Sequence, residues 1–182
     1  MASAEKGWEF TLSNEDPEKT GKVITDIDGG MTRYGIDSRS HPEALARGFY
    51  SMSTAEALDF AFDIYKYDYW SGLLGYQIES QLIASKIVDM AFNEDPHQAT
   101  LLLQRAVNRL RPADKQLVVD GRCGVLTIAA VNTYLDQPDE EALYASIVYE
   151  GAQFYEKLLG EDQDRYQGSY AGWIRRLNKR PS

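Results

Sequence analysis

Apolar residues recur at helical spacing through most of the chain. One stretch runs from Ser53 to Trp70, and Ser53 followed three residues later by Glu56 is a capping-box signature for its first turn. A second stretch spans residues 79–92. The positions that share one face in these two stretches are Leu58, Ala61, Phe62 and Tyr65, then Leu82, Ile83, Ile87 and Met90.

The same reasoning predicts five more helices, over 3–14, 97–110, 125–135, 139–159 and 170–179. Asp95 is the expected N-cap of the helix at 97–110, with Pro96 at its first helical position. Asp120 and Gly121 predict a turn in the connector 111–124.

Residues 15–41 interrupt the helical pattern with four glycines and many charges. Gly21, Gly29, Gly30 and Gly35 break any helix there, and the stretch GKVIT leaves room for a short β-hairpin. The prediction is a mostly α fold with a small hairpin and loop region near the N-terminus. Any site should be in that loop.

Composition narrows the class of protein. A chain of 182 residues that is 43% hydrophobic suits one compact unit. It contains no apolar run long enough to span a bilayer, and its opening residues lack a signal peptide pattern. A net charge of −9 opposes nonspecific nucleic-acid binding, although basic residues cluster at 175–180.

Cysteine and histidine are scarce, which limits metal and thiol chemistry. Cys123 is the one cysteine, so no internal disulfide can form, and we expect it to be a buried or half-buried structural residue. His41 and His97 lie far from it and from each other in sequence. We therefore expect no metal site and no cofactor.

The loop could serve one of three functions: calcium binding, phosphate binding or cleavage of a glycosidic bond. An EF-hand needs acids at alternate positions followed by a twelfth-place glutamate, and the alternation stops after Asp26 and Asp28. Phosphate cradling needs a P-loop lysine that the Asp-Gly-Gly sequence lacks. Acid/base cleavage of a glycosidic bond needs one protonated carboxyl group and commonly a second carboxylate, which this loop can supply.

Glu15 stands where the first helical pattern stops, and Asp26 and Thr32 follow at intervals of eleven and six residues. The three can converge if the hairpin turns back over the helix end. Burial of Glu15 against aromatic side chains would keep it protonated, as a general acid must be. The alternative is that Asp26 and Asp28 only bond the backbone of their own turn.

Several segments, in order along nearly the whole chain, resemble glycoside hydrolase family 108, the phage and bacterial N-acetylmuramidases. They are FTLSNEDPEKTGKVITDIDGGMTRYGID (10–37), IYKYDYW (64–70), VDMAFN (88–93), LLQRAV (102–107), VDGRCGVLT (119–127) and GWIRRL (172–177). The first resembles the family's catalytic Glu followed by a GGxTxxGI turn. The last four resemble its peptidoglycan-binding segment.

The chain departs from the family pattern at two places. Asp16 and Pro17 follow Glu15 where glycines are usual, so Glu9 is the alternative catalytic glutamate. Ile27 stands where the family places an aspartate, between Asp26 and Asp28. Asp26 keeps an Asp-x5-Thr spacing that is also similar to phage lysozymes of the Glu-Asp-Thr type, and Asp28 or a mechanism with Glu15 alone stays open.

The resemblance implies a lysozyme-like enzyme with a catalytic segment at 1–88 and a helical peptidoglycan-binding segment at 89–182, packed as one unit. Tyr65 and Trp173 are expected in the core. Glu15 would be the general acid, and Asp26 and Thr32 would hold or activate the attacking water. The residues expected to hold the glycan are Tyr34, Tyr69, Trp70 and Asn93.

The expected reaction is hydrolysis of the β-1,4 bond between N-acetylmuramic acid and N-acetylglucosamine. The partner is bacterial peptidoglycan, without nucleic acid or membrane, and the protein is expected to be a monomer. It would stay in the host bacterial cytoplasm until released to the periplasm or wall for phage or bacterial cell lysis. The alternatives are a lytic transglycosylase and a noncatalytic binding or structural module of a phage particle.

Overall fold

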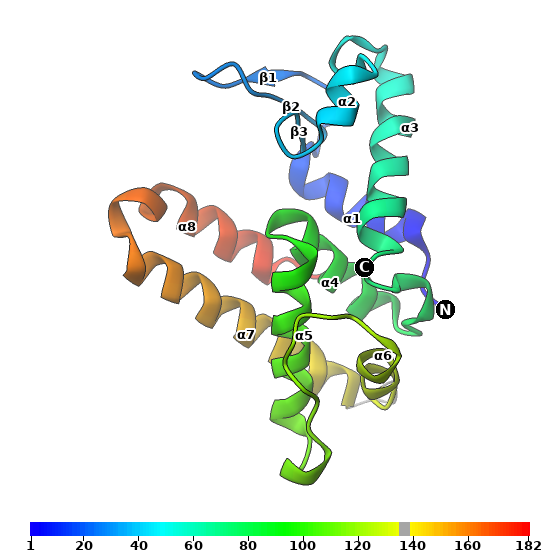
Figure 1. The fold of residues 1–182 in the computed structure, drawn as a ribbon, viewed down its shortest axis with the longest axis vertical. Coiled ribbons are helices and arrows are strands. Elements are labelled where there is room, and N and C mark those ends of the chain that lie inside the picture. The colour runs from blue at the N-terminus through cyan, green and yellow to red at the C-terminus, as the bar shows by residue number, and fades with distance from the viewer. Residues whose placement is uncertain (135–138) are drawn as a thin grey trace.

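The computed structural model describes residues 1–134 and 139–182, in which helices dominate and a small sheet lies near the N-terminus (Figure 1). The predicted fold class is confirmed. The helices are α1 (Ala4–Glu15), α2 (Pro42–Ala46), α3 (Thr54–Ile64), α4 (Gln81–Asn93), α5 (Pro96–Leu110), α6 (Val125–Asn132), α7 (Asp139–Glu161) and α8 (Gln163–Asn178). The strands are β1 (Ile24–Thr25), β2 (Met31–Arg33) and β3 (Ile36–Asp37).

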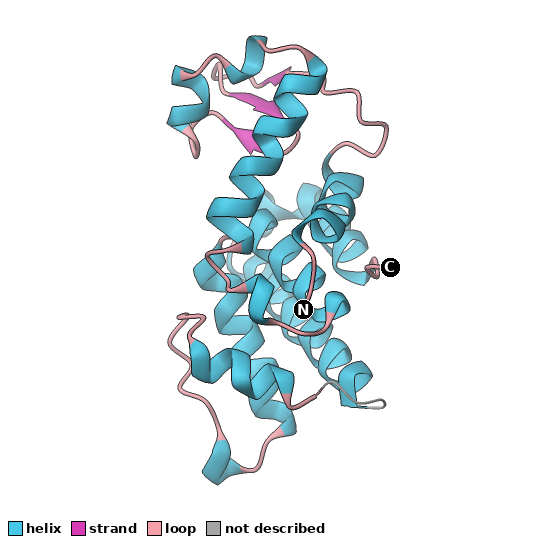
Figure 2. Cartoon of the chain, turned by 90° about the vertical axis from the view of Figure 1, so that its right-hand side faces the viewer, coloured by secondary structure: helices cyan, strands magenta, loops and turns pink. Residues whose placement is uncertain are grey.

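The three strands form one antiparallel sheet in the order β1-β2-β3, at the same end of the molecule as α2 (Figures 1 and 2). Thr32 pairs with Ile24 on one side and with Asp37 on the other. A two-residue turn joins β2 to β3, and both of its residues have positive φ, 51° at Tyr34 and 79° at Gly35. Such a turn matches the twist of the strands it joins.

Helix α4 is the centre of the molecule. It packs against α1 on one side and α5 on the other, while α7 packs against α5 and α8. Its residues Ile83 and Ile87 are fully buried. In Figure 1, α7 and α8 run side by side as a hairpin that projects from the helical body. No helix among the described residues has the length and apolar character needed to cross a membrane.

Local capping explains where two of the helices begin. The reciprocal bonds of a capping box join Ser53 and Glu56 at the start of α3, as predicted. The Asp95 side chain accepts from the backbone of Gln98 at the start of α5, with Pro96 in the first turn. The turn at 120–121 is also confirmed, because Gly121 has a φ of 71°.

Three predicted elements differ in extent from those in the structure. The expected hairpin is a three-stranded sheet, because β3 returns after the Tyr34–Gly35 turn. The last helix begins at Gln163, seven residues earlier than predicted, because the Asp162 side chain caps the backbone of Arg165 in a stretch too polar to show an apolar period. The helix predicted at 125–135 ends at Asn132, and Leu135 lies outside the described residues.

Candidate active site

Glu15 is the last residue of α1, and its side chain is 21% exposed. The turn between β2 and β3 lies directly on it. A Cβ at Gly35 would stand 2.8 Å from Cγ and Cδ of Glu15 and 2.5 Å from the ring of Phe92. Glycine is therefore required at 35 both by its positive φ and by the close approach of Glu15. This contact joins the sheet to the end of α1.

Arg176 of α8 reaches Glu15 from the opposite side. Its Nη1 donates to Oε1 of Glu15, while Nε and Nη2 donate to the two carboxylate oxygens of Asp89 at 3.1 and 2.9 Å. Asp89 is 1% exposed and also accepts from the amide of Asn14 at 3.0 Å. Burial by itself lowers the pKa of Arg176, but the carboxylates of Asp89 and Glu15 raise it, so the guanidinium stays charged.

The network continues from Arg176 into α7. Nη1 of Arg176 donates to Oδ1 of Asn93 at 3.2 Å, the Asn93 amide donates to the Tyr155 hydroxyl at 3.0 Å, and that hydroxyl donates to Oε1 of Glu94 at 2.7 Å. Asn93 is half-buried, and Arg176 bonds both Asn93 and Glu15. This position is compatible with the predicted role of Asn93 beside the substrate.

A buried lysine fixes the end of α8 that carries Arg176. Lys86 of α4 is fully buried, and its Nζ donates to the backbone carbonyls of Arg176, Leu177 and Lys179. Burial lowers the pKa of Lys86 to about 8. Because these carbonyls are the ones a helix end leaves without partners, Lys86 satisfies them and ties α8 to α4.

On the sheet side, Asp26 holds the turn that joins β1 to β2. Its Oδ1 accepts from the backbone of Asp28 at 3.0 Å and of Gly30 at 2.7 Å, and its Oδ2 accepts from Arg39. A Cβ at Gly30 would lie 2.7 Å from both Arg39 and Asp26, so glycine permits this pairing. Asp26 therefore bonds the backbone of its own turn as well as Arg39, and Asp28 is exposed.

Thr32 belongs to the same cluster through a residue that sequence reasoning passed over. The Thr32 hydroxyl donates to Oδ2 of Asp37 at 3.4 Å, and Asp37 also accepts from the side chain of Arg39 at 3.1 Å. Hydrogen bonds from Arg39 lower the pKa of Asp37, which keeps it ionised. The register of β2 with β3, which sets Thr32 opposite Asp37, is the one signal that could have found it.

The aromatic residues predicted to hold sugar lie in different environments. Trp70 is 2% exposed beneath Gly7, and Tyr34 is 3% exposed beneath Gly21, so both are core residues and the expectation that they line a groove is corrected. Both are large rings next to a glycine that leaves room for them. Tyr69 is half-buried against Phe92, with ring centroids 4.8 Å apart.

Two further expectations about burial can be compared with the structure. Tyr65 is fully buried, as predicted. Trp173 is instead half-buried and faces a cavity. Cys123 is half-buried as expected, its thiol donates to the carbonyl of Leu73 at 3.3 Å, and burial raises its pKa to about 11.

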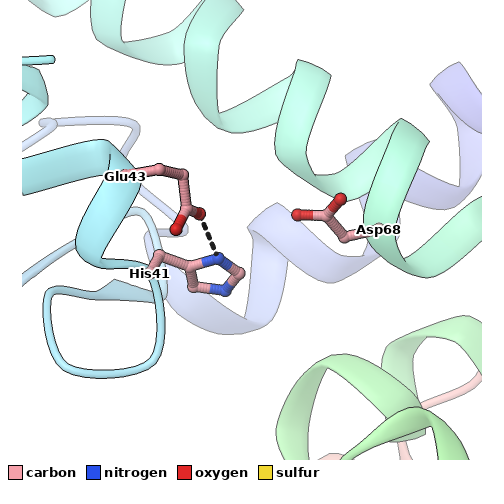
Figure 3. Close-up of side chains that lie close together, drawn as sticks. All are labelled: His41, Glu43 and Asp68. Atoms are coloured by element: carbon pink, nitrogen blue, oxygen red, sulfur yellow. Dashed lines mark hydrogen bonds and ion pairs between the residues drawn. The ribbon is translucent and has the colours of Figure 1, made fainter.

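His41 and Glu43 face Asp68 across a short gap between α2 and the π-helical segment Tyr65–Trp70 (Figure 3). One potential ligand atom from each lies within 4.8 Å of the others, a spacing that a metal ion could bridge. Nδ1 of His41 already meets Glu43 at 3.0 Å and Nε2 meets the Tyr69 hydroxyl at 3.0 Å. In this structure the histidine holds Tyr69, and a metal would have to displace one of these bonds.

Tyr69 is consequently fixed near Glu15 by its hydroxyl. Burial raises its pKa to about 12, and the charges of Asp68, Glu15 and Glu43 add to that effect. The structure thus gathers Glu15, Tyr69 and Asn93 around the end of α1, while Asp26 and Thr32 belong to the sheet cluster.

Two family models match consecutive parts of the chain. The family model for Glycosyl hydrolase 108 matches residues 20–94, and the model described as Predicted Peptidoglycan domain matches residues 98–178. The first match begins after Glu15. No curated protein is significantly similar in sequence.

The fold is similar to a solved structure described as that of Brucella abortus SagA. The TM-score is 0.66 with 20% sequence identity, over 96% of this chain and 88% of that one. At that identity the likeness bears on the fold alone.

These matches define a glycoside hydrolase segment followed by a peptidoglycan-binding segment. The Glycosyl hydrolase 108 model and the Predicted Peptidoglycan domain model each cover less than half of the chain, and the two matches follow one another along it. The resemblance found in the sequence is confirmed, and peptidoglycan is the substrate class that both segments indicate. The boundary predicted after residue 88 stays a prediction.

Proposed function

We propose that the protein is an N-acetylmuramidase that cleaves the β-1,4 bond between N-acetylmuramic acid and N-acetylglucosamine, with Glu15 as the general acid. The observation that carries this proposal is the position of Glu15. It is a half-buried carboxyl group at a helix end, held between the Gly35 turn on one side and Arg176 on the other. A single carboxyl group fixed from two sides is suited to deliver a proton in one direction.

The ion pair with Arg176 by itself favours the charged form of Glu15, whereas a general acid must carry a proton. Arg176, however, forms two bonds with buried Asp89, and that carboxylate compensates most of its charge. Arg176 contacts Oε1 of Glu15, so a proton on Oε2 leaves that hydrogen bond intact.

The sheet cluster supplies the second group. Asp26 is proposed to activate water that Thr32 helps to position, with Arg39 holding both Asp26 and Asp37. The turn at Gly35 touches Glu15 and the turn at Asp26 lies at the other end of β2, so about 10 Å of strand separates them. We propose an inverting reaction, in which the two carboxyl groups stand about 6.5–9.5 Å apart to admit water, whereas a retaining reaction needs about 5 Å.

Digestion of purified sacculi tests the proposal. Wild type should release soluble glycan, and Glu15→Gln should bind sacculi and release at least about a hundredfold less, because loss of a general acid costs 10²–10⁴ in rate. Glu9→Gln is the matched control and should stay active. Digestion by Glu15→Gln at the wild-type rate would falsify the role of Glu15.

The products and the fate of sacculi separate the alternatives. Reducing N-acetylmuramic acid ends support hydrolysis, whereas anhydro ends show a lytic transglycosylase. Sacculi that sediment with wild type but stay intact show a noncatalytic binding module.

We further propose a role in cell lysis, in which the protein waits in the bacterial cytoplasm until the membrane is opened. Fractionation of intact producing cells should then find it inside the membrane.

A further inference from the structure

A cavity of about 240 Å³ lies where α7 and α8 meet the junction of α4 and α5. Its walls are aromatic. Tyr155 and Trp173 stack with centroids 5.2 Å apart at 20°, and Tyr166 tilts against Trp173 at 5.6 Å. Three aromatic rings line one hollow, and the π-systems of such rings carry a negative face that attracts cations.

One carboxyl group in this cavity is incompletely bonded. Oε1 of Glu94 accepts from Tyr155, but Oε2 is covered from solvent and has no hydrogen-bond partner among residues 1–134 and 139–182. A buried oxygen without a donor costs free energy, and native structures rarely tolerate it without a reason. Burial raises the pKa of Glu94 to about 7.

The charges near Glu94 are mostly of its own sign. Asp95 follows it and Asp89 lies on the same helix, and both raise its pKa, while Arg176 lowers it. Arg176 is already bonded to Asp89 and Glu15. The cavity therefore combines an acidic group that lacks a donor with aromatic walls, which is the chemistry that recognises a cation.

We propose that this cavity binds a primary ammonium group of peptidoglycan, with Glu94 as its counter-ion and Tyr155, Tyr166 and Trp173 as its walls. Because Oε2 is covered in this structure, the Glu94 side chain must turn it toward the cavity, where the ammonium supplies the donor that it lacks. Two sources offer this group, the free side-chain amine of a diamino acid in the peptide stem and the amine of a glucosamine that has lost its acetyl group. An anion is excluded by repulsion, and a neutral amide leaves the carboxylate charge uncompensated.

The cavity lies beside the proposed catalytic site, and the inference rests on the proposed function for its choice of substrate. Asn93 lines the cavity, donates to Tyr155 and accepts from Arg176, which holds Glu15. Asn93 and Arg176 therefore connect the cavity to Glu15 through two hydrogen bonds. This subsite makes the enzyme prefer peptidoglycan with free amines.

Calorimetric titration of the full chain with two matched pairs of probes tests the proposal. The first pair is a disaccharide tripeptide ending in a diamino acid with a free side-chain amine, and the same compound with that amine acetylated. The second is a glucosamine trimer and its N-acetylated form. Wild type should bind the free-amine member of one pair at least tenfold more tightly, and the pair that shows this preference identifies the source.

Glu94→Gln should bind both members of that pair equally, because it removes the charge and keeps the shape. Glu156→Gln removes an exposed acid on α7 and should behave like wild type. Tyr166→Ala should weaken binding of the free-amine probe two- to fivefold. The thermal midpoint of each variant verifies that it is folded. Glu94→Gln should fold, because it replaces a buried carboxyl group with a neutral amide of similar shape.

Equal affinity within both pairs for wild type overturns the inference, as does a preference that survives in Glu94→Gln. Sacculus digestion separates this result from a failure of the proposed function. Wild type that digests sacculi without amine preference refutes only the subsite. Wild type that discriminates between amines and leaves sacculi intact refutes only the muramidase.

Discussion

Two arginines flank the proposed site, and each holds two carboxylates. Arg176 binds Glu15 and Asp89 with its side chain 14% exposed, whereas Arg39 binds Asp26 and Asp37 with its side chain 59% exposed. Both clusters pair one guanidinium group with two carboxylates, but they differ in how much of the arginine side chain is exposed to solvent. A buried network holds its members at fixed distances, while an exposed one is screened and can rearrange when substrate arrives.

The largest contrast is expected in stability. Arg176→Met leaves the Asp89 carboxylate buried without its cation, which costs about 3–5 kcal/mol of unfolding free energy. Arg39→Met is the matched control and should shift the urea midpoint little, since Arg39 and Asp26 are exposed and Asp37 is only partly buried. Urea unfolding of the two variants measures the difference. Similar midpoints for both would show that burial does not distinguish the two clusters.

The second contrast concerns activity within the sheet cluster. If Asp26 activates water, Asp26→Asn should lower the rate of sacculus digestion about a hundredfold, or about 2.7 kcal/mol in the barrier. Asp28→Asn removes a neighbouring charge from the same exposed turn and should retain most activity. The amide at position 26 can still accept the turn's hydrogen bonds, so both variants should fold. Equal rates for the two would leave Asp26 a turn residue only.

The smallest expected effect is a pH dependence of the protein's stability that comes from the buried carboxyl group of Glu94. The pKa of Glu94 is raised from 4.5 to about 7, so the folded state binds this proton more tightly than the unfolded chain. The stability that this proton adds is fully present below pH 4.5 and is lost as pH rises through 7. Glu94→Gln should remove this part of the pH profile.

Thermal unfolding of wild type and Glu94→Gln at pH 5 and 8 measures that difference. The groups that face Glu94 are Asp89, Asp95, Tyr155 and Arg176, and both proteins share them. A wild-type profile that runs parallel to that of Glu94→Gln would show that the carboxyl group is ionised throughout.

The sequence predicted the features that depend on neighbouring residues. Ser53 with Glu56 and Asp95 with Pro96 located two helix starts, because a cap is a bond between residues a few positions apart. Gly35 was predicted to break any helix in the loop, which is also a local property of the residue. The fold class and the position of Glu15 at the end of the first helix followed from this local information.

Only the tertiary structure decided which side chains face one another. Arg176 meets Glu15 across 161 positions of sequence, and Tyr155 meets Glu94 across 61. Trp70 was expected at a sugar and is in the core, because a glycine sixty-three positions earlier leaves room for its ring. The periodicity of apolar residues shows which face of a helix is buried. Packing between helices distant in sequence determines what that face is buried against, and therefore where Glu15, Arg176 and the cavity lie.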